Sequence, residues 1–481
     1  MLLFCLLSSL PLGTLHKYLP LQIKHIYSFT LGEFYIYLVI GPFAAVQLLI
    51  YSLIFYITAS VLLKSSLYRK TGLILTITNM LYLSILHIYR MYVDYLGWSL
   101  DISLAAMILI VKLNMCAYNW TDGRLLLQNQ KLSEKEYIHE YRANKSVLHT
   151  NIIEFLGYTF FYPSVLVGPC TELCLYLKYS NGILLRNAGF KKWPNSTKSC
   201  LISLRNAIFC YIGMIIATQF PILGYMETPK YLNNSFYYRF IYFWIALTSC
   251  RFKYYFSWYL AEAGCQASGM ALCVNENIEK NRENGRISFG GCANAYASIV
   301  ELAPHVFIIT NNWNLGVNNW LKHYVYFRCS VPQSLKIVPQ KTFANIVTKL
   351  MSACWHGFYG SYYLFFIGAW FTSEMDDAMR FTVEPIIEKT GNRMLIRLYQ
   401  VFSWFMIYMI MNYLGAAFML LRVDYSMRFW SSFYYYGFWL PLLIIIICQF
   451  LPKKRPERPQ TENKQISTKI LMNGIDRKKD L

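Results

Sequence analysis

Charged residues are scarce in this sequence. They make up only 15% of the 481 residues, against roughly 25% in a typical soluble protein, whereas apolar residues make up 56%. A soluble fold is excluded, because the chain has too little polar surface to cover a core of that size. The composition predicts one polytopic, all-α membrane domain.

Long polar segments are also few, and apolar stretches of membrane-spanning length recur roughly ten times, although several fall short of a full crossing by apolar residues alone. A transmembrane helix needs about 20 predominantly apolar residues. The clearest stretches are 38–63, 73–88, 104–118, 200–221, 240–248, 298–310, 346–370, 399–421 and 434–451. We therefore expect roughly nine to eleven transmembrane or re-entrant helices, in a membrane domain that covers residues 1–451.

Several motifs of soluble enzymes are missing. None of the 13 cysteines belongs to a Cys-x-x-Cys pair, which argues against both a zinc site and a disulfide scaffold and favours buried thiols. The chain also lacks a Gly-rich phosphate loop, a Gly-x-Ser-x-Gly nucleophile elbow and a carboxylate pair with metal spacing. We expect no bound metal or cofactor and no covalent serine chemistry.

Acidic residues are absent between Leu302 and Ser373, and the basic residues there are Lys322, Arg328, Lys336, Lys341 and Lys349. The positive-inside rule places this loop in the cytosol. In a membrane protein, the net charge of +20 reports cytosolic loops that face anionic headgroups rather than a nucleic-acid partner.

The last segment, residues 452–481, combines prolines with charges and is expected to be a flexible basic cytosolic tail. Lys478 and Lys479 resemble the di-lysine retrieval signal of endoplasmic-reticulum membrane proteins, which a coat protein reads on the cytosolic side. The alternative is a basic tail without a targeting role.

The orientation of the tail depends on the stretch 346–370. If this stretch and the two after it each crossed the membrane once, the tail would lie opposite the cytosolic loop. We therefore expect the stretch to enter and return, or to break at Gly357 and Gly360, as irregular backbone at membrane depth is tolerated where protein surrounds it.

Trp355-His356-Gly357 lies inside this apolar stretch. A histidine is costly in hydrocarbon, so a histidine at this position is by default a candidate functional residue. Upstream lies a second cluster, in which Trp313-Asn314 is followed after five residues by Trp320-Leu321 and then by Val325-Tyr326-Phe327-Arg328.

These two elements resemble the membrane-bound O-acyltransferase family, and within it the lysophospholipid acyltransferase branch. That branch carries Trp-Asn, five residues, Trp-Leu and Val-Tyr-x-Arg, followed by Ser-Ala-x-Trp-His-Gly, which Ser352 to Gly357 match. The resemblance extends to other segments in the family's order: His87 to Tyr95, Tyr162-Pro163-Ser164, Gly168-Pro169 and Arg251 to Tyr255. It implies helices around an intramembrane active-site chamber.

One departure concerns the residues after the histidine. The family usually has Pro-Gly-Tyr there, whereas this chain has Gly360-Ser361-Tyr362. The exchange loosens a turn that proline would stiffen, which affects substrate preference more than reaction type.

The resemblance implies that His356 and Asn314 are catalytic. Transfer of an acyl group to a hydroxyl needs a base for the proton and donors for the carbonyl oxyanion. His356 suits the base, and the Asn314 amide suits the carbonyl, the hydroxyl or the imidazole. The alternatives are a core histidine bound to a carbonyl and an asparagine that caps a helix.

Aromatic and basic neighbours complete the candidate site. Trp313, Trp320, Tyr326 and Trp355 are expected to line the path of the substrate, unless they form an interfacial belt or pack in the core. Lys322 and Arg328 suit the phosphates of coenzyme A, with contact to lipid headgroups as the alternative.

Together these features predict a lysophospholipid O-acyltransferase of the endoplasmic reticulum that uses acyl-CoA as co-substrate. Its partners would be acyl-CoA, a lysophospholipid, the membrane and the retrieval machinery that reads Lys478 and Lys479. The alternatives are a relative that acylates a sterol, a diacylglycerol or a protein, a transporter, and a non-catalytic scaffold.

Overall fold

The computed structural model describes residues 1–97, 99–273, 287–332 and 337–452, and these residues are helical or lie in loops, apart from one β-bridge between Cys273 and Ser288. The expected all-α fold is confirmed. Lys478 and Lys479 lie outside the described residues.

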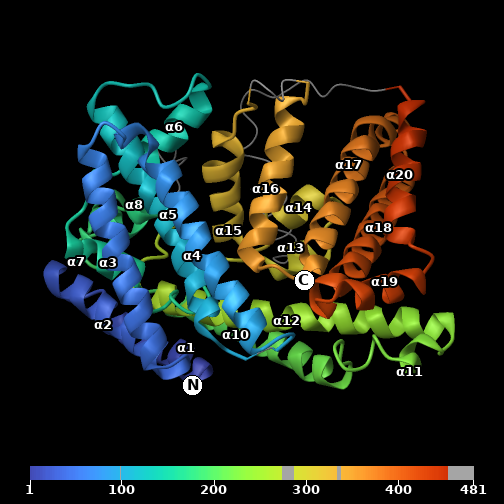
Figure 1. Cartoon of the computed structure of the whole chain (residues 1–481), viewed down its shortest axis with the longest axis horizontal. Coiled ribbons are helices and arrows are strands. Elements are labelled where there is room, and N and C mark those ends of the chain that lie inside the picture. Colours follow the sequence, from blue (N-terminus) through green and yellow to red (C-terminus); the bar gives the residue numbers. More distant parts are fainter. Residues whose placement is uncertain (98, 274–286, 333–336, 453–481) are drawn as a thin grey trace.

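The first part of the chain forms a helical bundle at the left of Figure 1. Its interior is a continuous core that includes Phe55, Leu83, Leu109 and Trp120. The bundle contains α1 (Leu2–His16), α2 (Leu21–Val39), α3 (Pro42–Lys64), α4 (Thr71–Val93), α5 (Ile102–Leu127), α6 (Glu136–Lys145), α7 (Ile152–Thr159), α8 (Leu173–Ser180) and α9 (Ile183–Asn187).

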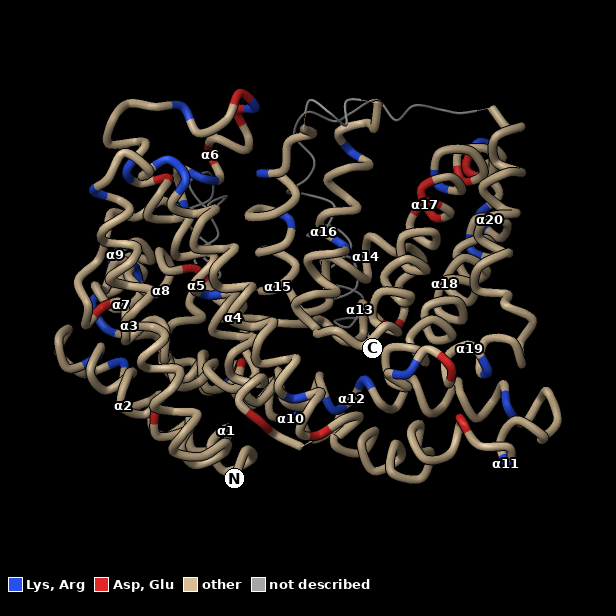
Figure 2. The backbone as a smooth tube through the Cα atoms, in the orientation of Figure 1, with Lys and Arg blue, Asp and Glu red and all other residues tan. Residues whose placement is uncertain are grey.

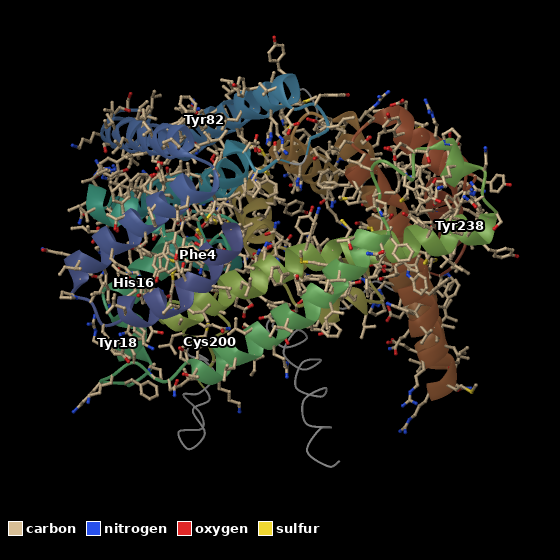
Figure 3. All side chains as sticks on the ribbon, turned by 90° about the horizontal axis from the view of Figure 1, so that it is seen from below. Phe4, His16, Tyr18, Tyr82, Cys200 and Tyr238 are labelled. Carbon is tan, nitrogen blue, oxygen red and sulfur yellow. The ribbon has the colours of Figure 1, made fainter. Side chains whose placement is uncertain are left out.

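Two long helices, α10 (Thr197–Gln219) and α12 (Phe236–Ser268), lie along the underside, joined through the short α11 (Pro229–Leu232). Seen from below, Cys200 near the start of α10 and Tyr238 near the start of α12 lie at opposite ends of this antiparallel pair (Figure 3). Helix α1 crosses α12 so closely that a Cβ on Gly264 would lie 2.2 Å from Ser9 Oγ. Small residues permit such close helix crossings in membrane proteins.

The second bundle is built on α17 (Gly360–Lys389), α18 (Arg393–Leu420), α19 (Val423–Ser431) and α20 (Tyr436–Gln449). It has a separate core, which includes Phe243, Met375, Tyr413 and Trp430. Between the two bundles lie α15 (Leu315–Trp320), its π and 3-10 continuations Leu321–Val325 and Tyr326–Arg328, and α16 (Gln340–His356) (Figure 1).

Five of the described helices are long and apolar enough to cross a membrane, or six if α19 and α20, which are bent by 66°, form one broken span. The expected count was roughly nine to eleven. Part of the difference comes from 298–310, which forms two short helices, α13 (Ala297–Glu301) and α14 (Val306–Thr310), separated around Pro304. Proline removes a backbone donor and ends the preceding helix. The stretch 240–248 belongs to the 33-residue α12.

The stretch 346–370 is broken, as expected, at Gly357 and Gly360. Helix α16 ends at His356, the chain turns, and α17 begins at Gly360 and runs back towards the side on which α16 started (Figure 1). Helix α20 also ends on that side. Charged residues gather at the upper loops and along the lower layer, and are sparser between them (Figure 2).

Candidate active site

The last turn of α16 is fixed to the first bundle by two hydrogen bonds of Trp355. Its indole Nε1 donates to the Met107 carbonyl on α5 at 3.0 Å, and its own carbonyl accepts from His87 Nε2 on α4 at 3.0 Å. The Trp355 side chain is buried. Its direct neighbour His356 is therefore held at a defined position relative to both helices.

Gly357 makes the turn that ends α16 directly after His356. Its φ of 125° lies in a region that side chains rarely adopt, and glycine adopts it without a steric cost. A Cβ there would only touch the His87 ring, at an ordinary contact distance of 3.5 Å, so the constraint is the backbone conformation. A larger residue at this position would strain the turn beside the candidate base.

Aromatic side chains surround the His356 imidazole. Its ring centroid lies 4.8 Å from that of Phe418 on α18 and 5.8 Å from those of Tyr362 and Phe366 on α17. The side chain is half buried, so part of its surface remains accessible. Within the described residues it has no hydrogen-bond partner, which differs from the alternative of a core histidine bound to a carbonyl.

Asn314 stands immediately before α15, at the N-cap position, but its side chain makes no capping hydrogen bond. The amide is half buried and has no hydrogen-bond partner within the described part of the chain. Its backbone is left-handed, with φ 46° and ψ 58°. Such a conformation is uncommon for a residue with a side chain, and asparagine is among those that tolerate it.

The conformation of Asn314 is fixed by contacts of the two following residues. Leu315 N donates to the Asn294 carbonyl at 2.8 Å, and Gly316 N donates to Asn294 Oδ1 at 3.3 Å. A Cβ on Gly316 would lie 2.7 Å from the Cys170 backbone, so only glycine permits this approach. The start of α15 is thereby anchored to the Gly168–Pro169 loop.

The two candidate catalytic residues lie at the same end of two antiparallel helical segments. The segment from α15 to Arg328 rises beside α16, which it contacts, and α16 descends to His356 (Figure 1). Asn314 at the start of one segment and His356 at the end of the other are thus brought to one end despite their separation in sequence.

The other predicted residues occupy different environments. Trp320 is fully buried in the first core. Trp313 packs edge-on against Trp258 at 5.0 Å, in a separate small cluster. Tyr326 is half buried and Lys322 is exposed. Lys322 lies in the π-helical turn, an irregularity that is frequent at functional sites.

Arg328 has a protein partner. Its Nη1 donates to Asp122 Oδ1 at 3.1 Å, and Nη2 donates to Oδ2 at 2.5 Å. The guanidinium also stacks on Tyr118 at 4.1 Å. No sequence pattern predicts this ion pair, because the two residues are 206 positions apart.

Two further acids, the half-buried Glu301 and the buried Glu172, are also paired. Glu301 accepts from Arg251 at 2.6 and 2.8 Å and from Tyr255 at 2.7 Å, which joins α12 to α13. Glu172 accepts from Tyr324 at 2.7 Å. These contacts explain why carboxylates are tolerated there.

The departure from Pro-Gly-Tyr is accommodated by α19. A Cβ on Gly360 would lie 2.6 Å from Val423 Cγ2, so a larger residue would need the Val423 side chain or α19 to shift. Ser361 and Ser426 share a hydrogen bond of 2.9 Å in a buried position. This contact ties the start of α17, next to Tyr362, to the amphipathic α19.

The chain is similar over most of its length to several known acyltransferases. The chain is 27% identical over 473 residues to lysophospholipid acyltransferase 2 of Arabidopsis thaliana, covering 96% of this chain and 95% of that protein. It is 27% identical to the lysophospholipid acyltransferase of Schizosaccharomyces pombe, with 90% and 83% covered. It is 25% identical to human membrane-bound glycerophospholipid O-acyltransferase 1, with 92% and 86% covered. The profile of the membrane-bound O-acyltransferase family matches residues 82–421, and the chain belongs to this family.

Proposed function

We propose that this protein transfers a fatty acyl group from acyl-CoA to a free hydroxyl of a lysophospholipid, with His356 as general base. The observation that carries the assignment of the base is the His356 imidazole, half buried among aromatic rings and without a partner among the described residues. Relatives named for lysophospholipid acyltransfer, each similar over most of their length, support the choice of acceptor.

The reaction is a single displacement. His356 takes the proton of the lysolipid hydroxyl as its oxygen attacks the thioester carbonyl, so that the new C–O bond forms. The C–S bond then breaks, and the proton passes to the sulfur, which leaves as the thiol of coenzyme A. The Asn314 amide donates to the carbonyl oxygen while it carries negative charge, or orients the hydroxyl.

The surroundings suit substrates that are apolar at one end and charged at the other. Phe366 and Phe418 beside His356 provide an apolar wall for acyl chains. We assign Trp313 and Tyr326 to the walls of the substrate path, and Trp320 and Trp355 to its support from the core. Lys322, exposed on the π-turn, and Arg328 are the proposed contacts to the phosphates of coenzyme A.

Two variants can separate a role of Arg328 in phosphate binding from its structural role in the ion pair with Asp122. We expect Arg328→Ala to raise the KM for acyl-CoA more than the KM for lysolipid, by roughly tenfold to a hundredfold, because charge-assisted hydrogen bonds are worth about 1.5–3 kcal/mol. Asp122→Asn is the matched control, as it keeps the guanidinium and weakens only its anchor. If both variants weaken both substrates equally, Arg328 serves the fold alone.

The protein is a multi-pass membrane protein, and we place it in the endoplasmic reticulum. Support comes from the paired lysines at 478 and 479, together with α20, which ends on the side where α16 begins (Figure 1). With the basic loop before α16 in the cytosol, a tail that continues from α20 starts on the cytosolic side.

Replacement of Lys478 and Lys479 by serine should let the protein leak beyond the endoplasmic reticulum without a loss of membrane insertion. An epitope at Leu481 should be accessible to antibody after selective permeabilisation of the plasma membrane. Microscopy and surface labelling provide the readout. An epitope that stays protected until the reticulum itself is opened would overturn the orientation and the signal together.

A further inference from the structure

One face of α16 carries a polar stripe, defined by the side chains Thr342, Asn345, Lys349, Ser352 and His356. Their spacing alternates between three and four residues, which places them one above another on a helix. The stripe thus runs from the first turn of α16 to the candidate base at its end.

The opposite face of α16 is apolar and occupied. Val347 and Met351 pack against the core of the first bundle, and Trp355 belongs to that core. The polar stripe is therefore turned away from the first bundle. It points to the side where Tyr362 and Phe418 of the second bundle surround His356.

None of the stripe side chains is bonded to another described residue through its polar atoms. Four of them are half buried and Ser352 is buried but retains a small accessible fraction, 7%. Unpaired polar side chains inside a helical assembly are unfavourable unless water or a ligand satisfies them. A row of them that ends at the candidate base marks a path for a polar molecule.

Lys349 is the charged member of this row. An unpaired ammonium away from bulk water is costly, and within membrane proteins such groups typically mark substrate paths. Three acids in the middle of α17 have other partners: Glu374 accepts from Trp370 Nε1 at 3.2 Å, Asp376 accepts from His305 at 2.9 Å, and Asp377 accepts from Arg380 at 2.8 Å. No described residue supplies the anion that Lys349 lacks.

The position of Lys349 relative to His356 suits one substrate held at two points. Seven residues separate them, which corresponds to two turns and about 10 Å along the helix axis. Both proposed substrates carry phosphate esters away from their reacting atoms: the coenzyme in its phosphopantetheine and nucleotide portions, and the lysolipid in its headgroup.

We propose that Lys349 binds a phosphate ester of a substrate whose reacting end lies at His356. This inference rests on the proposed function, since it names a further specificity residue for that reaction. The lysine holds the charged portion through its ammonium, while Asn345 and Ser352 provide hydrogen bonds along the path between.

The test compares Lys349→Met with Lys349→Arg in purified protein, using labelled oleoyl-CoA and a lysophospholipid as substrates. We expect Lys349→Met to raise the KM for one of the two by roughly tenfold to a hundredfold, with kcat less affected, and Lys349→Arg to restore most of the binding. The matched control is Lys341→Met, on the same helix, whose exposed ammonium pairs with Asp377 at 3.5 Å. It should leave both constants near the wild-type values.

The pattern of constants identifies the source of the phosphate. A selective rise for oleoyl-CoA assigns Lys349 to the coenzyme, and a selective rise for the lysophospholipid assigns it to the headgroup. Unchanged constants in Lys349→Met, or an equal loss for both substrates that Lys349→Arg does not restore, would overturn the proposal. Wild-type protein without transfer activity would instead refute the proposed function.

Discussion

His356→Ala should reduce acyl transfer by roughly 10²- to 10⁴-fold, because that is the contribution of a positioned general base. The protein should remain folded and in the membrane, because within the described residues the imidazole makes no hydrogen bond whose loss would destabilise the fold. Initial rates with labelled acyl-CoA, normalised to purified protein, provide the measurement.

The control for this variant is His149→Ala. His149 is an exposed histidine whose Nε2 lies 3.0 Å from Ser60 Oγ, outside the candidate site. Its removal should leave the rate near the wild-type value. If the purified His356→Ala variant keeps near-normal acyl transfer, His356 is not the general base, even though the chain belongs to this family.

Loss of the Asn314 amide should slow turnover by roughly 10²- to 10³-fold, the usual cost of one lost donor to an oxyanion. Two variants separate the amide from the backbone. Asn314→Gly keeps the left-handed conformation, with its φ of 46°, whereas Asn314→Ala also strains it. We expect both to lose activity, and Asn319→Ala, on the exposed face of α15, to retain it.

The double variant tests whether the two residues act together. Residues of one catalytic unit have strongly non-additive effects, so His356→Ala combined with Asn314→Gly should be little slower than His356→Ala alone. Fully multiplicative losses would mean that Asn314 acts outside the step that His356 assists.

Local patterns in the sequence were sufficient to predict much of this architecture. The scarcity of charge predicted the helical membrane fold, and Gly357 and Gly360 indicated where the apolar stretch 346–370 breaks. The limits of such patterns appear at 298–310, where apolar composition suggested a span and Pro304 divides it into two short helices.

Contacts between residues that are far apart in the sequence could not be predicted from it. Trp355 and His87 are 268 positions apart, and no spacing rule connects them, yet their hydrogen bond helps fix the end of α16. The same holds for Arg328. Its charge suggested a contact with a substrate phosphate, whereas its position in the fold brings it into an ion pair with Asp122. A side chain's chemistry is read from its type, whereas its partners depend on the packing of distant helices.

The most direct test is to incubate the purified protein with labelled oleoyl-CoA and a panel of acceptors: lysophospholipids of different headgroups, a sterol, a diacylglycerol and a peptide. We expect label to enter one or more lysophospholipids as diacyl product, with release of free coenzyme A, and to be lost in His356→Ala. Label that enters only a sterol, a diacylglycerol or a peptide, or no acceptor at all, would contradict the account.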